Sequence, residues 1–133
     1  MSQNLKNKSV WYKSKIIKGR GIAKTLGFPT INLENADILN NKQEGVYLCR
    51  LRLKINEYFG LLYYGPRLVL DETHRIIEIY IIDFEEAEIN SSMEFKLLDF
   101  IRPVLDFENL ESLKVQIDKD FDCARAIILN TSN

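Results

Sequence analysis

The stretch Gly45–Ile55, GVYLCRLRLKI, alternates in side-chain character from one residue to the next. One set of alternate positions is apolar, and the other is mainly basic: Tyr47, Cys49, Leu51, Leu53 and Ile55 against Leu48, Arg50, Arg52 and Lys54. A period of two predicts a strand with one buried face. The next residues, INEYFGLLYYG, predict a tight turn at Asn56–Glu57 and an antiparallel partner strand that ends near Gly65.

Further strands are predicted on both sides of this hairpin. The runs Val10–Lys18, Arg75–Phe84 and Ser92–Arg102 are rich in β-branched and aromatic residues. Residues 22–32 are predicted as a loop. Strands follow one another without intervening helices, so the sheet should be antiparallel. We therefore predict a mainly β fold, a six-stranded antiparallel Greek-key barrel that hides its strand edges.

The last part of the chain changes period. Apolar residues recur there at steps of three and four, at Leu110, Leu113, Ile117, Phe121, Ala124 and Ile128. This spacing predicts a helix with one apolar stripe, and Asn109 is placed to cap its start. Most of the aspartates at 118, 120 and 122 are expected to face water. The helix should pack outside the barrel.

The composition fits one domain over residues 1–133, with its core at about 10–129. No apolar run is long enough to cross a membrane, and the N-terminus shows no apolar leader. We expect Cys49 and Cys123 to be reduced core thiols in a cytoplasmic protein. His74, the one histidine, has no ligand spacing with either cysteine. We expect a monomer with no membrane partner.

Charge is distributed unevenly along the chain. Residues 1–33 carry seven Lys or Arg and no acid, whereas the remaining hundred residues hold all nineteen acids. A basic N-terminal quarter would attract nucleotide phosphates or a nucleic acid; the alternative is a solvated basic edge strand. The pI near 5.9 is not typical of a nucleic-acid-binding domain, so we expect no nucleic-acid partner.

Four residues with special backbone or hydrogen-bonding properties crowd into Lys24–Asn32, KTLGFPTIN. Gly27 allows close approach of the backbone, and Pro29 restricts the geometry around it. If the segment after Pro29 is extended, Thr30 and Asn32 point to the same side. Their hydroxyl and carboxamide oxygens would suit a magnesium ion that keeps water and phosphate ligands. The alternative is a rigid turn in which both side chains bond to the local backbone.

Glu78 lies in the middle of the apolar run RIIEIYII. By alternation it shares a face with Ile76, Tyr80 and Ile82. A carboxylate is costly to bury without partners, so Glu78 either faces water or lines a cavity. In a cavity its pKa would rise, and the carboxylate could act as a proton acceptor.

Together these segments resemble the riboflavin kinase (flavokinase) family. The resemblance rests on LGFPTIN, on GVY at Gly45, on the strand glutamate Glu78, on IR at Arg102 and on the C-terminal LESLKVQIDKD. It runs from about Val10 to Leu129. It implies a six-stranded barrel with a C-terminal helix. It also implies transfer of the γ-phosphate of ATP to the ribityl 5′-hydroxyl of riboflavin, giving FMN and ADP.

The resemblance assigns roles to individual residues. Thr30 and Asn32 would hold the magnesium ion of the nucleotide, and Glu78 would be the base. Arg102 and Phe107 would border the flavin. The loop over the phosphates would contain Gly21, Ala23, Lys24 and Gly27 beside Thr30 and Asn32. Magnesium is the implied cofactor, and riboflavin and ATP are the implied partners.

Three departures from the family pattern leave a second function open. Ala23 stands where the family has glycine, and Ile89–Asn90 stand where a Tyr-Gly pair is common. Pro66 and Arg67 stand in the reverse of the common order. The alternative is a catalytically weak or inactive barrel of the same fold that binds flavin or nucleotide.

Overall fold

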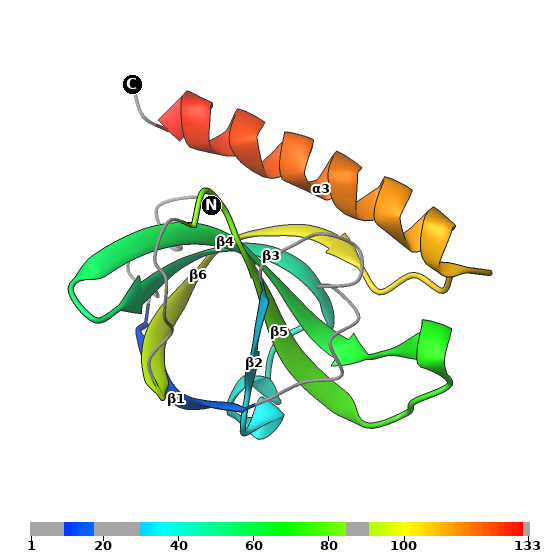
Figure 1. Ribbon diagram of the computed structural model, residues 1–133, viewed down its shortest axis with the longest axis horizontal. Helices are drawn as coiled ribbons and strands as arrows, with labels where there is room; N and C mark the ends of the chain where they lie inside the picture. The colour runs from blue at the N-terminus through cyan, green and yellow to red at the C-terminus, as the bar shows by residue number, and fades with distance from the viewer. Residues whose placement is uncertain (1–9, 18–29, 85–90, 132–133) are drawn as a thin grey trace.

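The computed structural model describes residues 10–17, 30–84 and 91–131. In these ranges the chain forms strands, two short 3-10 helices and one long α-helix (Figure 1). The strands are β1 (Tyr12–Ile17), β2 (Thr30–Leu33), β3 (Gly45–Leu53), β4 (Asn56–Pro66), β5 (Arg75–Ile81) and β6 (Ser92–Pro103). The helices are η1 (Ala36–Leu39), η2 (Leu68–Leu70) and α3 (Leu110–Thr131).

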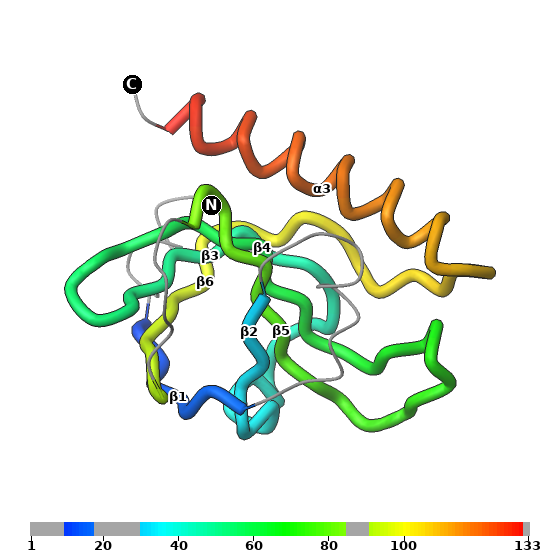
Figure 2. The backbone as a smooth tube through the Cα atoms, viewed as in Figure 1, coloured from blue at the N-terminus to red at the C-terminus, as the bar shows by residue number. Residues whose placement is uncertain are grey.

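The six strands close into one antiparallel barrel in the order β1-β2-β5-β4-β3-β6. β3, β4 and β5 are consecutive neighbours, and β6 returns to lie beside β3. This arrangement of three successive strands and a returning fourth is a Greek key. Figures 1 and 2 show α3 running across the outside of the barrel. The predicted fold class is confirmed.

The β3–β4 hairpin confirms the pattern of alternation but corrects its turn. Leu53 pairs with Asn56, so the two turn residues are Lys54 and Ile55 and not Asn56–Glu57. Lys54 takes the left-handed backbone conformation, with φ 53, that a two-residue hairpin turn requires. Ile55 is consequently 92% exposed and does not contribute to the buried face.

Other strand boundaries also differ from the prediction. β1 is shorter than Val10–Lys18, and β5 ends at Ile81 instead of Phe84. The segment after Pro29 is extended, because Thr30–Leu33 forms β2 and not the end of a loop. β2 pairs with β5 over four residue positions, which brings it next to the strand that contains Glu78.

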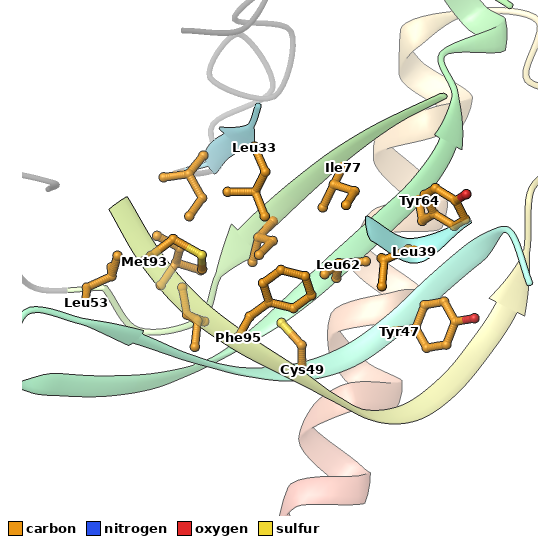
Figure 3. Packing of buried hydrophobic residues seen from close by; sticks show 14 residues of the cluster. Leu33, Leu39, Tyr47, Cys49, Leu53, Leu62, Tyr64, Ile77, Met93 and Phe95 are labelled. Carbon is orange, nitrogen blue, oxygen red and sulfur yellow. The ribbon is translucent and has the colours of Figure 1, made fainter. Parts of the chain in front are cut away.

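Buried side chains form two clusters, one on each side of the barrel wall. The inner cluster fills the barrel and includes Phe95, Leu62 and Ile79 (Figure 3). The outer cluster lies between the barrel and α3, where Val46, Leu48 and Leu61 meet Ile117 and Phe121 of the helix. Side chains alternate between the two faces of each strand. The inward-facing side chains form the inner cluster, and the outward-facing ones under α3 belong to the outer cluster.

The helix begins as the sequence predicts. The Asn109 Oδ1 atom accepts a hydrogen bond from the Ser112 backbone N–H at 2.8 Å, a typical N-cap contact. The stripe residues Ile117, Phe121 and Ala124 are buried. Cys49 is a buried free thiol, but the expectation that both cysteines are core residues is wrong, because Cys123 is exposed on α3. No helix in the described residues is long and apolar enough to cross a membrane.

Candidate active site

A single row of cross-strand neighbours runs over the outer wall of the barrel. Asn32 on β2 is opposite Glu78 on β5, and Glu78 is opposite Tyr63 on β4. Tyr63 in turn is opposite Val46 on β3, which is opposite Arg102 on β6. At about 4.8 Å between strands, the row spans about 19 Å. Segments that are 70 residues apart in sequence therefore share one surface under the start of α3.

A cavity of about 630 Å³, including its open mouth, lies over this row. The barrel contributes its floor, and the start of α3 with the segment before it contributes one side. Its lining combines apolar side chains with two arginines and two carboxylates: Val46, Leu61, Tyr63, Arg67, Leu68, Val69, Glu78, Tyr80, Arg102, Leu105, Phe107, Leu113, Ile117 and Asp120. An apolar pocket with a few charged groups is the usual form of a small-molecule site.

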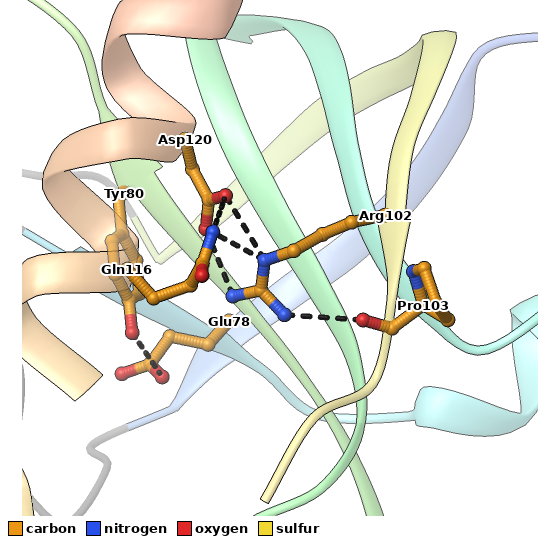
Figure 4. A network of polar contacts seen from close by, with 6 residues as sticks. All are labelled: Glu78, Tyr80, Arg102, Pro103, Gln116 and Asp120. Carbon is orange, nitrogen blue, oxygen red and sulfur yellow. Dashed lines mark hydrogen bonds and ion pairs between the residues drawn. The ribbon is translucent and has the colours of Figure 1, made fainter. Parts of the chain in front are cut away.

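Glu78 lines this cavity and is only 3% exposed. The Tyr80 hydroxyl donates to Glu78 Oε1 over a long 3.5 Å (Figure 4). Burial raises the pKa of the Glu78 carboxyl, and the nearby Arg67 guanidinium and the Tyr80 hydroxyl offset only part of that rise. Of the two interpretations from sequence, the cavity is the correct one. A carboxylate with a raised pKa in a cleft is a candidate proton acceptor.

Thr30 and Asn32 lie on the same side of β2, on the outer face that also carries Glu78. Asn32 Oδ1 accepts a hydrogen bond from Arg67 Nη2 at 2.6 Å, so its partner is 35 residues away and not the local backbone. Thr30 is half-buried opposite Tyr80.

Thr30 and Asn32 are the residues of β2 whose side-chain oxygens could hold a magnesium ion. Within the described ranges no group of three His, Cys, Asp or Glu side chains could hold a metal by itself. A hydroxyl and a carboxamide oxygen instead suit an ion whose other ligands are water and phosphate. The carboxamide oxygen has two lone pairs, and the bond from Arg67 uses one of them.

Arg102 connects the barrel to α3 through a buried ion pair. Its Nε and Nη2 atoms donate to both carboxylate oxygens of Asp120 at 2.8–3.0 Å (Figure 4). The two side chains are 12% and 4% exposed. Gln116 Nε2 donates to the same carboxylate at 3.0 Å. The Arg102 guanidinium lies 6.0 Å from the centre of the Phe107 ring, so both residues expected at the flavin line the cavity.

The structure brings together Glu78, Asn32, Arg102 and Phe107, either in the row or in the cavity lining. Neither Asn32 nor Thr30 lines the cavity; both adjoin it on β2. The predicted nucleotide residues Gly21, Ala23, Lys24 and Gly27 lie outside the described residues, as do Ile89 and Asn90.

Sequence reasoning missed two charged residues of this site. Asp120 belongs to the aspartates expected mostly in water, and Asp118 and Asp122 are indeed exposed, yet Asp120 is 3% exposed. The available signal is that Asp120 lies three residues after Ile117 and four before Ala124, on the same face of the helix as the apolar stripe. Arg67 was noted only for its order with Pro66, because nothing in the local pattern indicates that its side chain reaches Asn32.

The fold and the site define a class of protein: a Greek-key barrel with a small-molecule cavity under its C-terminal helix. Residues 6–128 match the family model described as Flavokinase, riboflavin kinase. The chain therefore belongs to the riboflavin kinase family.

Two similar curated proteins have riboflavin kinase in their names. The chain is 31% identical over 127 residues to the "Bifunctional riboflavin kinase/FMN adenylyltransferase" of Haemophilus influenzae, covering 95% of this chain and 41% of that protein. It is 34% identical over 116 residues to the protein of the same name from Listeria monocytogenes, covering 86% and 37%. The chain thus spans about two fifths of the length of these relatives.

Two solved structures share the fold. The "Macrolide-efflux Protein" of Streptococcus pneumoniae superposes with a TM-score of 0.72 at 21% identity, covering 90% of this chain and 39% of that one. The riboflavin kinase of Trypanosoma brucei superposes with a TM-score of 0.62 at 18% identity, covering 90% and 79%. At these identities the likeness concerns the fold alone.

Proposed function

We propose that this chain transfers the γ-phosphate of ATP to the ribityl 5′-hydroxyl of riboflavin, giving FMN and ADP. Membership of the riboflavin kinase family supports the reaction class. The single observation that carries the proposal is the pairing of Glu78, buried at the floor of the cavity, with Asn32 across the β2–β5 ladder. In this proposal the base, Glu78, and the amide that binds the nucleotide, Asn32, are direct cross-strand neighbours.

Each end of the cross-strand row has a separate task in the proposal. Thr30 and Asn32 bind the magnesium-nucleotide at one end, with Gly21, Ala23, Lys24 and Gly27 covering its phosphates. Arg102 and Phe107 border the isoalloxazine at the other end. Cross-strand neighbours are about 4.5–5.5 Å apart at Cβ, so Glu78 and Asn32 can contact the two reacting groups at once.

The chemistry needs no covalent intermediate. The ribityl oxygen attacks the γ-phosphorus, and its proton moves to a carboxylate oxygen of Glu78. The bond between the γ-phosphorus and the β,γ-bridging oxygen breaks, and its electron pair leaves with ADP. A magnesium ion held by Thr30 and Asn32 would supply positive charge beside the phosphate oxygens, which phosphoryl transfer requires. Apolar walls formed by Leu61, Leu113 and Ile117 exclude water, which would compete as acceptor.

The test is direct. The purified chain is incubated with riboflavin and Mg-ATP, and the flavins are separated by chromatography. The expected result is FMN formed in equal amount with ADP. Binding of both ligands without FMN would favour the inactive binding barrel instead. Failure to bind either riboflavin or the nucleotide would reject both functions.

A further inference from the structure

Arg67 directly follows Pro66, the last residue of β4. Its carbonyl oxygen accepts hydrogen bonds from the backbone N–H groups of Leu70 and Glu72, at 3.0 and 3.1 Å. These bonds close the turn that contains η2. The Arg67 side chain is only 10% exposed, and it lines the same cavity as Glu78. Burying a charged guanidinium costs free energy. The buried position of Arg67 therefore indicates that its side chain has a function.

The contacts of Arg67 do not use all of its donors. Nη2 donates to Asn32 Oδ1 at 2.6 Å. Nη1 lies 3.6 Å from Glu72 Oε1, which is an ion pair beyond ordinary hydrogen-bond length. Nε is buried and has no hydrogen-bond partner among the residues that the structure describes. An unsatisfied buried donor lowers stability, and an acceptor on a ligand in the cavity would supply the missing hydrogen bond.

The position of this guanidinium matches the place of phosphoryl transfer. It is bonded to Asn32, which is the cross-strand neighbour of Glu78. Its positive charge also acts on Glu78, because it lowers the pKa that burial raises. The other arginine of the cavity, Arg102, has both Nε and Nη2 engaged with Asp120. Arg67 is therefore the cavity arginine with an open donor beside the base.

We propose that Arg67 binds the terminal phosphate of the nucleotide and stabilises the charge on its oxygens during transfer, as a catalytic residue. This inference rests on the proposed function. A planar guanidinium with several donors matches the oxygens of a phosphate better than an ammonium does. Arg67 keeps its protons throughout, and the proton of the hydroxyl still moves to Glu78. The bond to Asn32 orients the guanidinium beside the nucleotide-binding end.

The experiment compares Arg67→Met, Arg67→Lys and the control Arg52→Met. Arg52 pairs with Glu57 and Glu94 on the barrel surface and does not line the cavity. For each protein we measure riboflavin binding by fluorescence quenching. We measure the affinities for Mg-ADP and for a non-hydrolysable ATP analogue by calorimetry, and then kcat by FMN formation. Circular dichroism checks that each variant is folded.

For Arg67→Met we expect kcat to fall about 10³-fold, which is typical of an arginine that stabilises transferring phosphate. The preference for the ATP analogue over ADP should fall by about 10-fold, while riboflavin binding stays within about 3-fold. Arg67→Lys should recover only part of both losses, because an ammonium cannot bind two oxygens in the same plane. Arg52→Met should match the unaltered chain.

Three results would overturn the proposal. They are an unchanged kcat in Arg67→Met, equal losses of ADP and ATP-analogue affinity, or full activity in Arg67→Lys. If Arg67→Met does not fold, Arg67→Lys decides by the same measurements. An unaltered chain that makes no FMN rejects the proposed kinase function, but the ratio of the two nucleotide affinities still tests Arg67 separately.

Discussion

Burying Glu78 in the barrel wall lowers the stability of the fold, because Arg67 and Tyr80 compensate the charged form for only part of the water it loses. We expect Glu78→Gln, which keeps the shape, to bind riboflavin and Mg-ATP with little change. Its kcat should fall about 10²–10⁴-fold, the range for loss of a general base. Its melting temperature at pH 7 should rise, because the buried charge is gone. The control Glu94→Gln lies outside the cavity and should leave kcat unchanged.

The raised pKa of Glu78 also predicts how kcat/KM and the free energy of unfolding depend on pH. The first should fall towards acid pH, and the second should fall as pH rises. The base must be ionised, so kcat/KM should fall on the acid side at a higher pH than an ordinary glutamate would cause. Between the ordinary pKa of about 4.5 and the raised value, the folded chain binds more protons than the unfolded chain. The free energy of unfolding from this group should therefore fall as pH rises through that window.

Urea unfolding of the original chain and of Glu78→Gln across this window checks the second dependence. The difference in stability between the two proteins should widen with pH and then level off above the raised pKa. A constant difference at all pH values would mean that Glu78 titrates as an ordinary glutamate.

Thr30 is tested by a change that removes one oxygen and keeps the volume. Thr30→Val should raise the KM for Mg-ATP by about 10-fold, the effect of losing one hydrogen bond or ligand to a charged group. Riboflavin affinity should not change, because the proposed function places that ligand beside Arg102 and Phe107, at the other end of the row. Thr131→Val, at the end of α3, is the matched control. Equal losses for both substrates would make Thr30 a structural residue.

At the scale of the elements, the buried pair Arg102–Asp120 joins β6 to α3. Asp120→Asn keeps the shape but leaves the Arg102 guanidinium buried without its counter-charge, so we expect a loss of about 3–5 kcal/mol in the free energy of unfolding. Riboflavin affinity should fall as well, because Arg102 lines the cavity. Urea unfolding and flavin fluorescence measure the two effects.

The same helix supplies the control for this prediction. Asp118 forms an i,i+4 pair with Lys114 at 3.6 Å, and both side chains are about half exposed. Exposed helix pairs contribute about 0.3–0.5 kcal/mol, so Asp118→Asn should be nearly neutral in both assays. If the two variants behave alike, the pair Arg102–Asp120 does not hold the helix in place.

At the scale of the whole molecule, the sequence predicted what depends on local periodicity. The alternation in Gly45–Leu53 and the stripe from Leu110 to Ile128 each require one buried face, and both elements formed as expected. The sequence does not predict β2, because four residues after a proline carry too little periodic signal. The hairpin turn lies at Lys54–Ile55 and not at the predicted Asn56–Glu57, because the apolar Ile55 continues the alternation in the sequence although it is exposed in the turn.

The site was predictable where one residue stood out against its surroundings. Glu78 interrupts an apolar run, so its environment had to be a cavity or water. Arg67 and Asp120 do not differ in this way from their neighbours in the sequence, because an arginine in a loop and an aspartate on a helix are both ordinary. Their roles follow from contacts across 35 and 18 residues. The first arises only when β4 and β2 come together in the barrel, and the second only when α3 packs against β6.

The two buried clusters share the strands that separate them, so the barrel and α3 should unfold as one cooperative unit. Phe121 is 7% exposed in the outer cluster, where its ring lies 6.4 Å from that of Tyr80. Phe121→Ala should cost about 3–5 kcal/mol through lost burial and a residual cavity. Trp11, the one tryptophan of the chain, lies under the Arg52 guanidinium at 4.0 Å and reports on the barrel.

Fluorescence of Trp11 and circular dichroism at the helix band therefore follow different parts of the molecule. The two urea transitions should coincide in the original chain, and Phe121→Ala should shift both to lower urea by the same amount. Loss of the helix signal before the Trp11 signal would mean that α3 detaches from a barrel that is stable alone. The cavity under the helix would then depend on a docking equilibrium, and riboflavin would raise the midpoint of the helix transition selectively.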